Sequence, residues 1–128
     1  MKSIGTSFAA CFLLIALSSP AFCLDISGNW DMKSASRFTV TMKQSGELAK
    51  GSYSFGKGNK GEIAGLIYDG LMEGFWFQDT ANRKCKTSKN GTYYWGRIVL
   101  EFTDSDVQGK DGYCDEAPSS PWTGKKRP

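Results

Sequence analysis

Few side chains in this 128-residue chain could carry chemistry. It has no histidine, and only Cys85 and Cys114 remain of its four cysteines after residue 23. Glu73 and Glu101 are the two carboxylates set in strongly apolar segments; they could form a general acid–base pair, but nothing in the sequence brings them together. With no histidine, no cysteine nucleophile and no metal-ligand spacing, the chain has few candidate groups for catalysis. We therefore expect a protein that is not an enzyme and that uses no metal and no cofactor.

Residues 1–23 have the pattern of a signal peptide. A basic second residue precedes an apolar run over 8–17, and the run ends in small residues that a signal peptidase accepts. The run is too short to anchor the chain in a bilayer. We expect cleavage after residue 23, or alternatively after Ala21. The mature protein would then be secreted or periplasmic, with one domain over 24–128.

Cys85 and Cys114 are the thiols that such a mature chain would keep. In an exported protein an even pair most simply forms a disulfide. Closing a loop of this length stabilises a fold by roughly 3.5 kcal/mol. A metal or redox pair is the alternative, but the two cysteines lack Cys-x-x-Cys spacing and have no histidine beside them.

The charge pattern excludes some partners. All 13 acidic residues and all but one of the 16 basic residues follow residue 23, so the mature chain is nearly neutral. Basic residues cluster only at 83–86 and 125–127, without the long stripe that neutralises a phosphate backbone. We expect no nucleic-acid partner. No later stretch is apolar enough for a membrane helix, so we also expect no membrane span.

The mature chain reads as short strands separated by turns. The clearest alternation is at 37–44, and Asp69-Gly70 and Asn90-Gly91 are hairpin signals. Trp30, early in the first segment, is the expected plug of the core. No segment has a sustained helical period. The strands are expected at 26–32, 37–44, 48–55, 62–68, 71–78, 92–103, 107–113 and 122–127.

Eight strands joined mostly by hairpins predict an all-β fold, an eight-stranded antiparallel up-and-down β-barrel with little or no helix. Closure removes the exposed strand edges. A barrel of this size is either filled by side chains or holds one small ligand.

Gly28-Asn29-Trp30 on the first strand, together with a basic residue near the end of the last, resembles the calycin signature shared by lipocalins and avidins. In those families the basic side chain stacks across the tryptophan and closes one end of the barrel. Arg127 is the best match, with Lys125 second. The chain is more similar to the avidin and streptavidin family, through the stretches 26–42, 50–53 and 94–96.

The avidin resemblance implies a ligand site. Ser36 and Tyr53 match residues that bind the ureido oxygen of biotin in that family. Met32 stands where the family has an asparagine, and Phe55 replaces a small hydroxyl residue. Because methionine cannot donate a hydrogen bond, a carbonyl oxygen would lose a partner there, at a cost of about 1–3 kcal/mol. We expect no tight binding of biotin, and either another ligand or a filled barrel.

Two functions fit these observations. The first is a barrel whose mouth binds a small, partly apolar ligand between a few aromatic, methionine and hydroxyl side chains. The second is a protein-binding module or inhibitor with a filled barrel and an exposed aromatic and basic surface around Tyr93, Trp95 and the loop 83–89. The predicted pocket of the first consists of Met32, Ser36, Tyr53, Phe55 and Trp76.

Segments 71–78 and 92–103 are apolar on both faces, although a barrel buries only the inward one. An exposed aromatic patch marks a partner or oligomer surface. The sequence therefore predicts a possible homo-oligomer, most simply a two-fold dimer with Trp95 near its centre.

Overall fold

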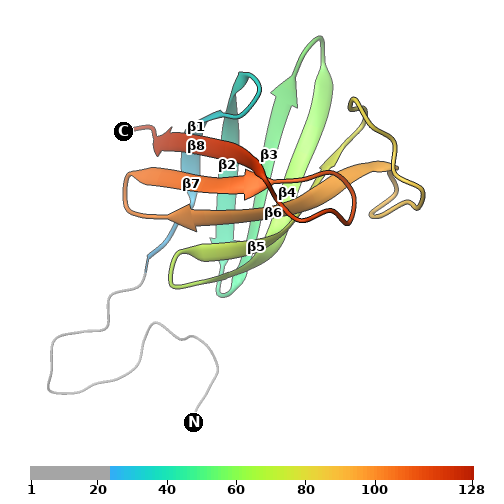
Figure 1. The fold of residues 1–128 in the computed structure, drawn as a ribbon. Helices are drawn as coiled ribbons and strands as arrows, with labels where there is room; N and C mark the ends of the chain where they lie inside the picture. The colour runs from blue at the N-terminus through green and yellow to red at the C-terminus, as the bar shows by residue number, and fades with distance from the viewer. Residues whose placement is uncertain (1–23) are drawn as a thin grey trace, which may run out of the picture.

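A computed structural model describes residues 24–128, and the predicted signal peptide lies outside them. Each strand pairs antiparallel with the next, and the last pairs with the first, so the sheet closes into a barrel (Figure 1). The predicted fold class is confirmed. The strands are β1 (Gly28–Lys33), β2 (Arg37–Ser45), β3 (Leu48–Phe55), β4 (Asn59–Tyr68), β5 (Leu71–Gln78), β6 (Tyr94–Phe102), β7 (Asp106–Asp111) and β8 (Ser120–Lys126).

The described residues contain no helix, and so none that is long and apolar enough to cross a membrane.

Local turn chemistry explains where the strands begin and end. Asp69 and Gly70 both have positive φ, 53° and 83°, as the tight hairpin between β4 and β5 requires. Asn90-Gly91 also forms a turn, but it closes only a small bridge between Lys89 and Thr92. The sixth strand therefore begins at Tyr94 rather than at residue 92, and the 79–93 segment is a long loop at one end of the barrel.

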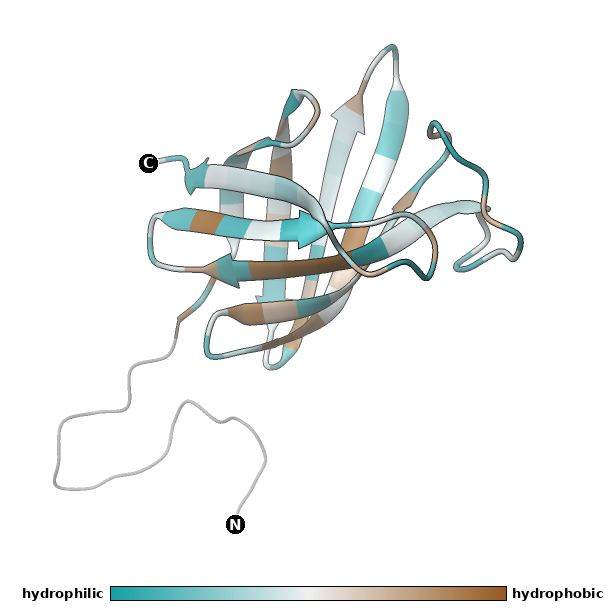
Figure 2. Ribbon diagram, viewed as in Figure 1, coloured by the Kyte–Doolittle hydropathy of each residue, from teal (hydrophilic) through white to brown (hydrophobic). Residues whose placement is uncertain are grey.

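The inward face of every strand contributes to one core, and buried positions alternate with more exposed ones along most strands. Figure 2 shows an apolar band between hydrophilic ones on β7 and a longer apolar stretch on β6. Trp30 is fully buried within the core. Its indole N–H donates to the carbonyl of Ile26 at 2.9 Å, and its ring meets Phe102 edge-on at 5.0 Å between centroids. The other large buried side chains include Met32, Met42, Ile63, Met72, Ile98 and Leu100.

The cation over Trp30 is Lys126, and neither Arg127 nor Lys125 takes this place. The Nζ of Lys126 lies 5.9 Å from the ring, and Trp30 and Lys126 are paired residues of β1 and β8. Arg127 instead donates to the carboxylate of Asp31 at 2.8 Å on the outer surface. The register of β8 against β1 decides which residue reaches the ring, and this register cannot be predicted from the spacing of residues along the chain. Gly28 leaves room for the Lys126 side chain, because a Cβ at this position would lie 3.0 Å from Lys126 Cε.

Candidate functional site at the barrel mouth

One end of the barrel holds a cavity of about 500 Å³. Three connections surround it: the β1–β2 turn, the 79–93 loop and the segment between β7 and β8. Figure 1 shows the last two next to each other at one end of the molecule. The opposite end is filled by the core around Trp30. The residues that line the cavity are Ser34, Ala35, Ser36, Phe38, Tyr53, Phe55, Trp76, Gln78, Ala81, Asn82, Asp111, Tyr113, Ser120, Pro121 and Trp122.

The structure brings four of the five predicted pocket residues to this cavity, namely Ser36, Tyr53, Phe55 and Trp76. Met32 points inward as expected but is 2% exposed within the core and does not line the cavity. Its sulfur occupies space beside Gly124, 2.8 Å from where a Cβ would stand on that glycine. Alternation thus predicts the side to which Met32 points, whereas its depth in the barrel depends on strand tilt and on Gly124.

Six of the fifteen residues that line the cavity are aromatic. Phe38 lies 4.9 Å from Tyr53 and 5.1 Å from Trp122, measured between ring centroids, and the second contact is edge-on. Across the cavity, Trp76 meets Tyr113 edge-on at 5.6 Å. Phe38, Tyr113 and Trp122 were not predicted as pocket residues. The inward alternation of β2 is a signal for Phe38, but nothing local indicates that β7 and β8 return to the same end.

The hydroxyl of Tyr53 belongs to a buried side chain of the predicted set. It accepts a hydrogen bond from Gln78 Nε2 at 2.8 Å. Burial raises the pKa of Tyr53 to about 12, partly offset by that hydrogen bond and reinforced by the charge of Asp111. The phenol therefore stays protonated at neutral pH, and its hydrogen is available to an acceptor on a ligand.

Among residues 24–128, Asp111 is the only charged side chain that lines the cavity. It ends β7 on the inward face, two positions after Gly109 and four after the buried Val107. Burial raises its pKa, while the nearby Trp122 indole N–H lowers it. Glu73 and Glu101, the carboxylates that the sequence places in strongly apolar segments, are both exposed on the outer face of the barrel.

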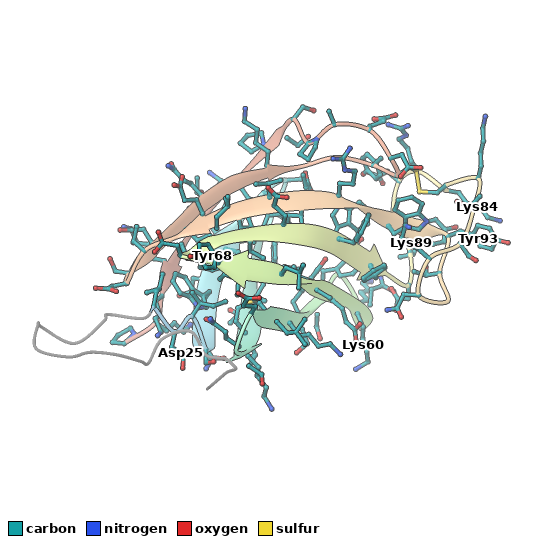
Figure 3. All side chains as sticks on the ribbon, turned by 90° about the horizontal axis from the view of Figure 1, so that it is seen from below. Asp25, Lys60, Tyr68, Lys84, Lys89 and Tyr93 are labelled. Atoms are coloured by element: carbon teal, nitrogen blue, oxygen red, sulfur yellow. A yellow bond between two sulfur atoms is a disulfide. The ribbon has the colours of Figure 1, made fainter. Side chains whose placement is uncertain are left out.

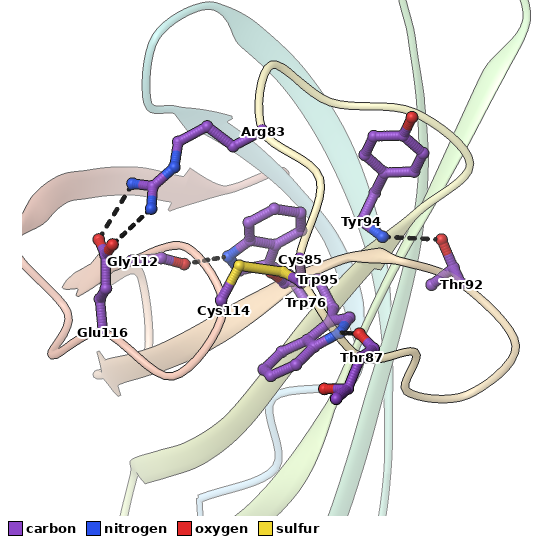
Figure 4. Close-up of a disulfide and its surroundings, with 10 residues drawn as sticks. All are labelled: Trp76, Arg83, Cys85, Thr87, Thr92, Tyr94, Trp95, Gly112, Cys114 and Glu116. Atoms are coloured by element: carbon purple, nitrogen blue, oxygen red, sulfur yellow. Dashed lines mark hydrogen bonds and ion pairs between the residues drawn. A yellow bond between two sulfur atoms is a disulfide. The ribbon is translucent and has the colours of Figure 1, made fainter.

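Cys85 and Cys114 form the predicted disulfide, 29 residues apart in the chain. The backbone N–H of Cys114 donates to the carbonyl of Trp95 at 2.9 Å, so the disulfide joins the 79–93 loop to the chain after β7 along the outer side of β6. Figure 4 shows it between the indoles of Trp76 and Trp95. The Trp76 N–H donates to the carbonyl of Gly112 at 2.9 Å, which holds that wall of the cavity in place.

Trp95 lies on the outer face of β6 and yet is 1% exposed, because the 79–93 loop covers it. Its ring meets Phe75 edge-on at 6.0 Å, and Lys89 Nζ lies 5.0 Å from the ring. Tyr93 remains exposed, with Lys84 Nζ 5.2 Å from its ring; both project from the loop in Figure 3. A partner docking here would contact Tyr93 and the loop, and Trp95 is not available as the centre of an interface.

Three or more metal-ligating side chains gather nowhere within residues 24–128. Comparisons with models of known protein families, with curated proteins and with solved structures find no match to this chain. The site itself is a pocket at the mouth of a closed barrel. It combines aromatic rings with one carboxylate, one buried phenol and a few amides and hydroxyls.

Proposed function

We propose that this protein is an exported, non-enzymatic barrel that binds a small, partly apolar ligand in its mouth. The observation that carries the proposal is the cavity of about 500 Å³ between Phe38, Tyr53, Trp76 and Trp122. Small-molecule sites are mostly apolar concavities of this size with a few polar groups that orient the ligand. Affinity comes from burial of apolar ligand surface, at about 25 cal/mol per Å².

The resemblance to avidins supports the same end of the barrel as the site. Ser36 and Tyr53, the two residues that match the family's ligand contacts, both line the cavity. Met32 supplies no donor, and Phe55 narrows the site where the family has a small hydroxyl residue. We therefore expect a ligand other than tightly bound biotin. The Cys85–Cys114 disulfide is the observation that favours a secreted or periplasmic location.

Native mass spectrometry of the protein purified from its source tests the proposal, because it reports a carried ligand directly. Ser36→Trp places a large ring in the cavity from the β1–β2 turn, and we expect it to abolish the carried mass. Ser54→Trp is the matched control, since Ser54 is exposed on β3 and lies outside the cavity. A carried ligand that survives Ser36→Trp, or a parent protein that retains no small molecule from its source, would contradict the proposal.

Self-association is a second function, favoured by an exposed apolar patch on the outer face of β3, β4 and β5. Leu66 and Tyr68 share the outer face of β4 and are 63% and 72% exposed. Leu48 lies opposite Leu66, and Leu71 lies opposite Tyr68, so the four side chains are contiguous. Figure 3 shows Tyr68 far from the disulfide loop. A two-fold dimer through this patch would leave the barrel mouth open.

A further inference from the structure

The carboxylate of Asp111 stands in an unusual place, at the inward face of a barrel whose other inward positions are almost all apolar. Asp111 pairs with Ser120 of β8, and Gly109 pairs with Trp122. These pairings place the carboxylate at the level of the cavity and the Trp122 indole next to it. Asp111 is half-buried and lines the cavity, so a ligand in the mouth would touch it.

No cation of the described chain neutralises this carboxylate. The ion pairs within residues 24–128 join Arg83 to Glu116, Lys125 to Asp106 and Arg127 to Asp31, all at exposed side chains. The Trp122 Nε1–H, in a residue 3% exposed, lies near Asp111 but makes no hydrogen bond of ordinary geometry. A partly buried charge without a partner destabilises the folded protein. A ligand that supplies the missing positive group therefore binds more favourably than one that does not.

The walls around Asp111 also suit a cation. Phe38, Tyr53, Trp76, Tyr113 and Trp122 line the same cavity, and the edge-on contacts turn neighbouring rings by 81° to each other. Aromatic faces carry a negative quadrupole and attract ammonium groups, and several rings arranged around one point form a cage for such ligands.

We propose that the ligand of the barrel mouth is an organic ammonium ion, whose positive group lies between the aromatic rings with Asp111 as its counter-ion. This inference rests on the proposed function and adds the chemical class of the ligand. The apolar part of the ligand packs against the remaining rings. The hydroxyl of Tyr53 and the amide of Asn82 are among the groups available to its polar substituents.

The rim does not oppose a cation. Arg83 lies over the Tyr113 ring at 5.0 Å, so this ring already accepts one cation at its exposed side. Arg83 is held there by a two-bond pair with Glu116, which neutralises its charge. An anionic ligand would face the unpaired Asp111 carboxylate and would be rejected, and a neutral ligand would leave that carboxylate without a partner.

A matched set of small probes tests the inference. Phenethylamine, which is protonated at neutral pH, differs from phenethyl alcohol only in its ammonium group, and 3-phenylpropanoate is the anionic counterpart. Binding is measured by titration calorimetry and by the NMR shift of the Trp122 indole N–H. We expect the amine to bind about tenfold more tightly than the alcohol, and the anion to bind most weakly. In Asp111→Asn the preference for the amine should disappear, whereas in Asp115→Asn, at an exposed position outside the cavity lining, it should remain.

The possible failures are distinguishable. Equal or tighter binding of the alcohol or the anion would overturn the ammonium inference and leave the mouth as a ligand site. A preference for the amine that persists in Asp111→Asn would also overturn the role of this carboxylate. If no probe shifts the Trp122 signal at millimolar concentration, both the inference and the proposed ligand site are contradicted.

Discussion

The indole N–H of Trp95 donates a hydrogen bond to the backbone carbonyl of Thr87 at 2.8 Å, although Trp95 lies on the outer face of the barrel. The 79–93 loop folds back over this ring beside the Cys85–Cys114 disulfide (Figure 4). On the neighbouring strand, the ring of Phe75 packs edge-on against Trp95. The fold thus has a second, smaller apolar layer outside the barrel. This layer explains why β5 and β6 are apolar on both faces without a partner chain at Trp95.

Replacing Trp95 by lysine should therefore destabilise the protein rather than separate subunits. Trp95→Lys removes a buried ring and places a charge beneath the loop, and we expect a loss of at least about 3 kcal/mol in the free energy of unfolding, measured by denaturant titration. Tyr93→Lys is the control, because Tyr93 is exposed, and it should change stability by no more than about 0.5 kcal/mol. A stable Trp95→Lys variant would show that the loop does not depend on this ring.

The exposed patch on β3, β4 and β5 predicts where subunits meet. We expect Leu66→Lys to convert a dimer into a monomer in analytical ultracentrifugation. The fold of the single barrel should be unaffected in a thermal melt, since Leu66 is exposed on the outer face of β4. Ser52→Lys, exposed on the same strand as Leu48 but further along it, should leave the dimer intact. A parent protein that sediments as a monomer at high micromolar concentration would exclude self-association through this patch.

Reduction of the disulfide should loosen the mouth more than the barrel. Cys85→Ser combined with Cys114→Ser removes the closure of a long loop, and we expect a loss of roughly 3.5 kcal/mol in the free energy of unfolding. The far-ultraviolet circular dichroism should still report β structure, while amide exchange speeds up in 79–93 and 112–119. Intact mass with and without reductant shows whether the native thiols are paired. Free thiols in protein purified under oxidising conditions would contradict the pairing.

Asp111 should make stability depend on pH. Because burial raises its pKa in the folded state, the folded carboxyl holds its proton more tightly than the unfolded one. The contribution of Asp111 to the free energy of unfolding is fully present below the ordinary pKa of 3.8. This contribution is lost as the pH rises through the higher pKa of the folded state. Asp111→Asn removes this loss, so the variant should melt above the parent protein at neutral pH and at nearly the same temperature near pH 3.

The comparison in that experiment needs a matched carboxylate, and Asp106 on the same strand provides one. The pKa of Asp106 is lowered by Lys125 and Ser105, so the ionised carboxylate stabilises the folded state at neutral pH. This stabilisation is lost as the pH falls, which is the opposite pH dependence from that of Asp111. Asp106→Asn should therefore not raise the melting temperature at neutral pH. A parent protein that is more stable than Asp111→Asn at neutral pH would mean that the folded chain compensates the Asp111 charge.

The residues that line the cavity could be predicted only in part from the sequence. Ser36 reaches the cavity from the β1–β2 turn and Tyr53 from the last part of β3, and the predicted strand boundaries at 26–32, 37–44 and 48–55 place both near one end of the barrel. Asp111 and Trp122 were not predicted as site residues, because β7 and β8 meet the cavity through the closure of the barrel and not through any local pattern. Their nearest pocket neighbours, such as Phe38 and Tyr53, are far away along the chain.

The sequence by itself determined the strands, most of their ends and the alternation of their faces, because a period of two and the residues of tight turns are local properties of the backbone. Tertiary structure decided which face of β5 is inward: Met72 and Trp76 are buried in the core, whereas Phe75 and Phe77 lie outside. It also decided that Lys126 covers Trp30 and that the loop covers Trp95. Register and loop packing depend on contacts between residues distant in the chain, and only the closed barrel brings those residues together.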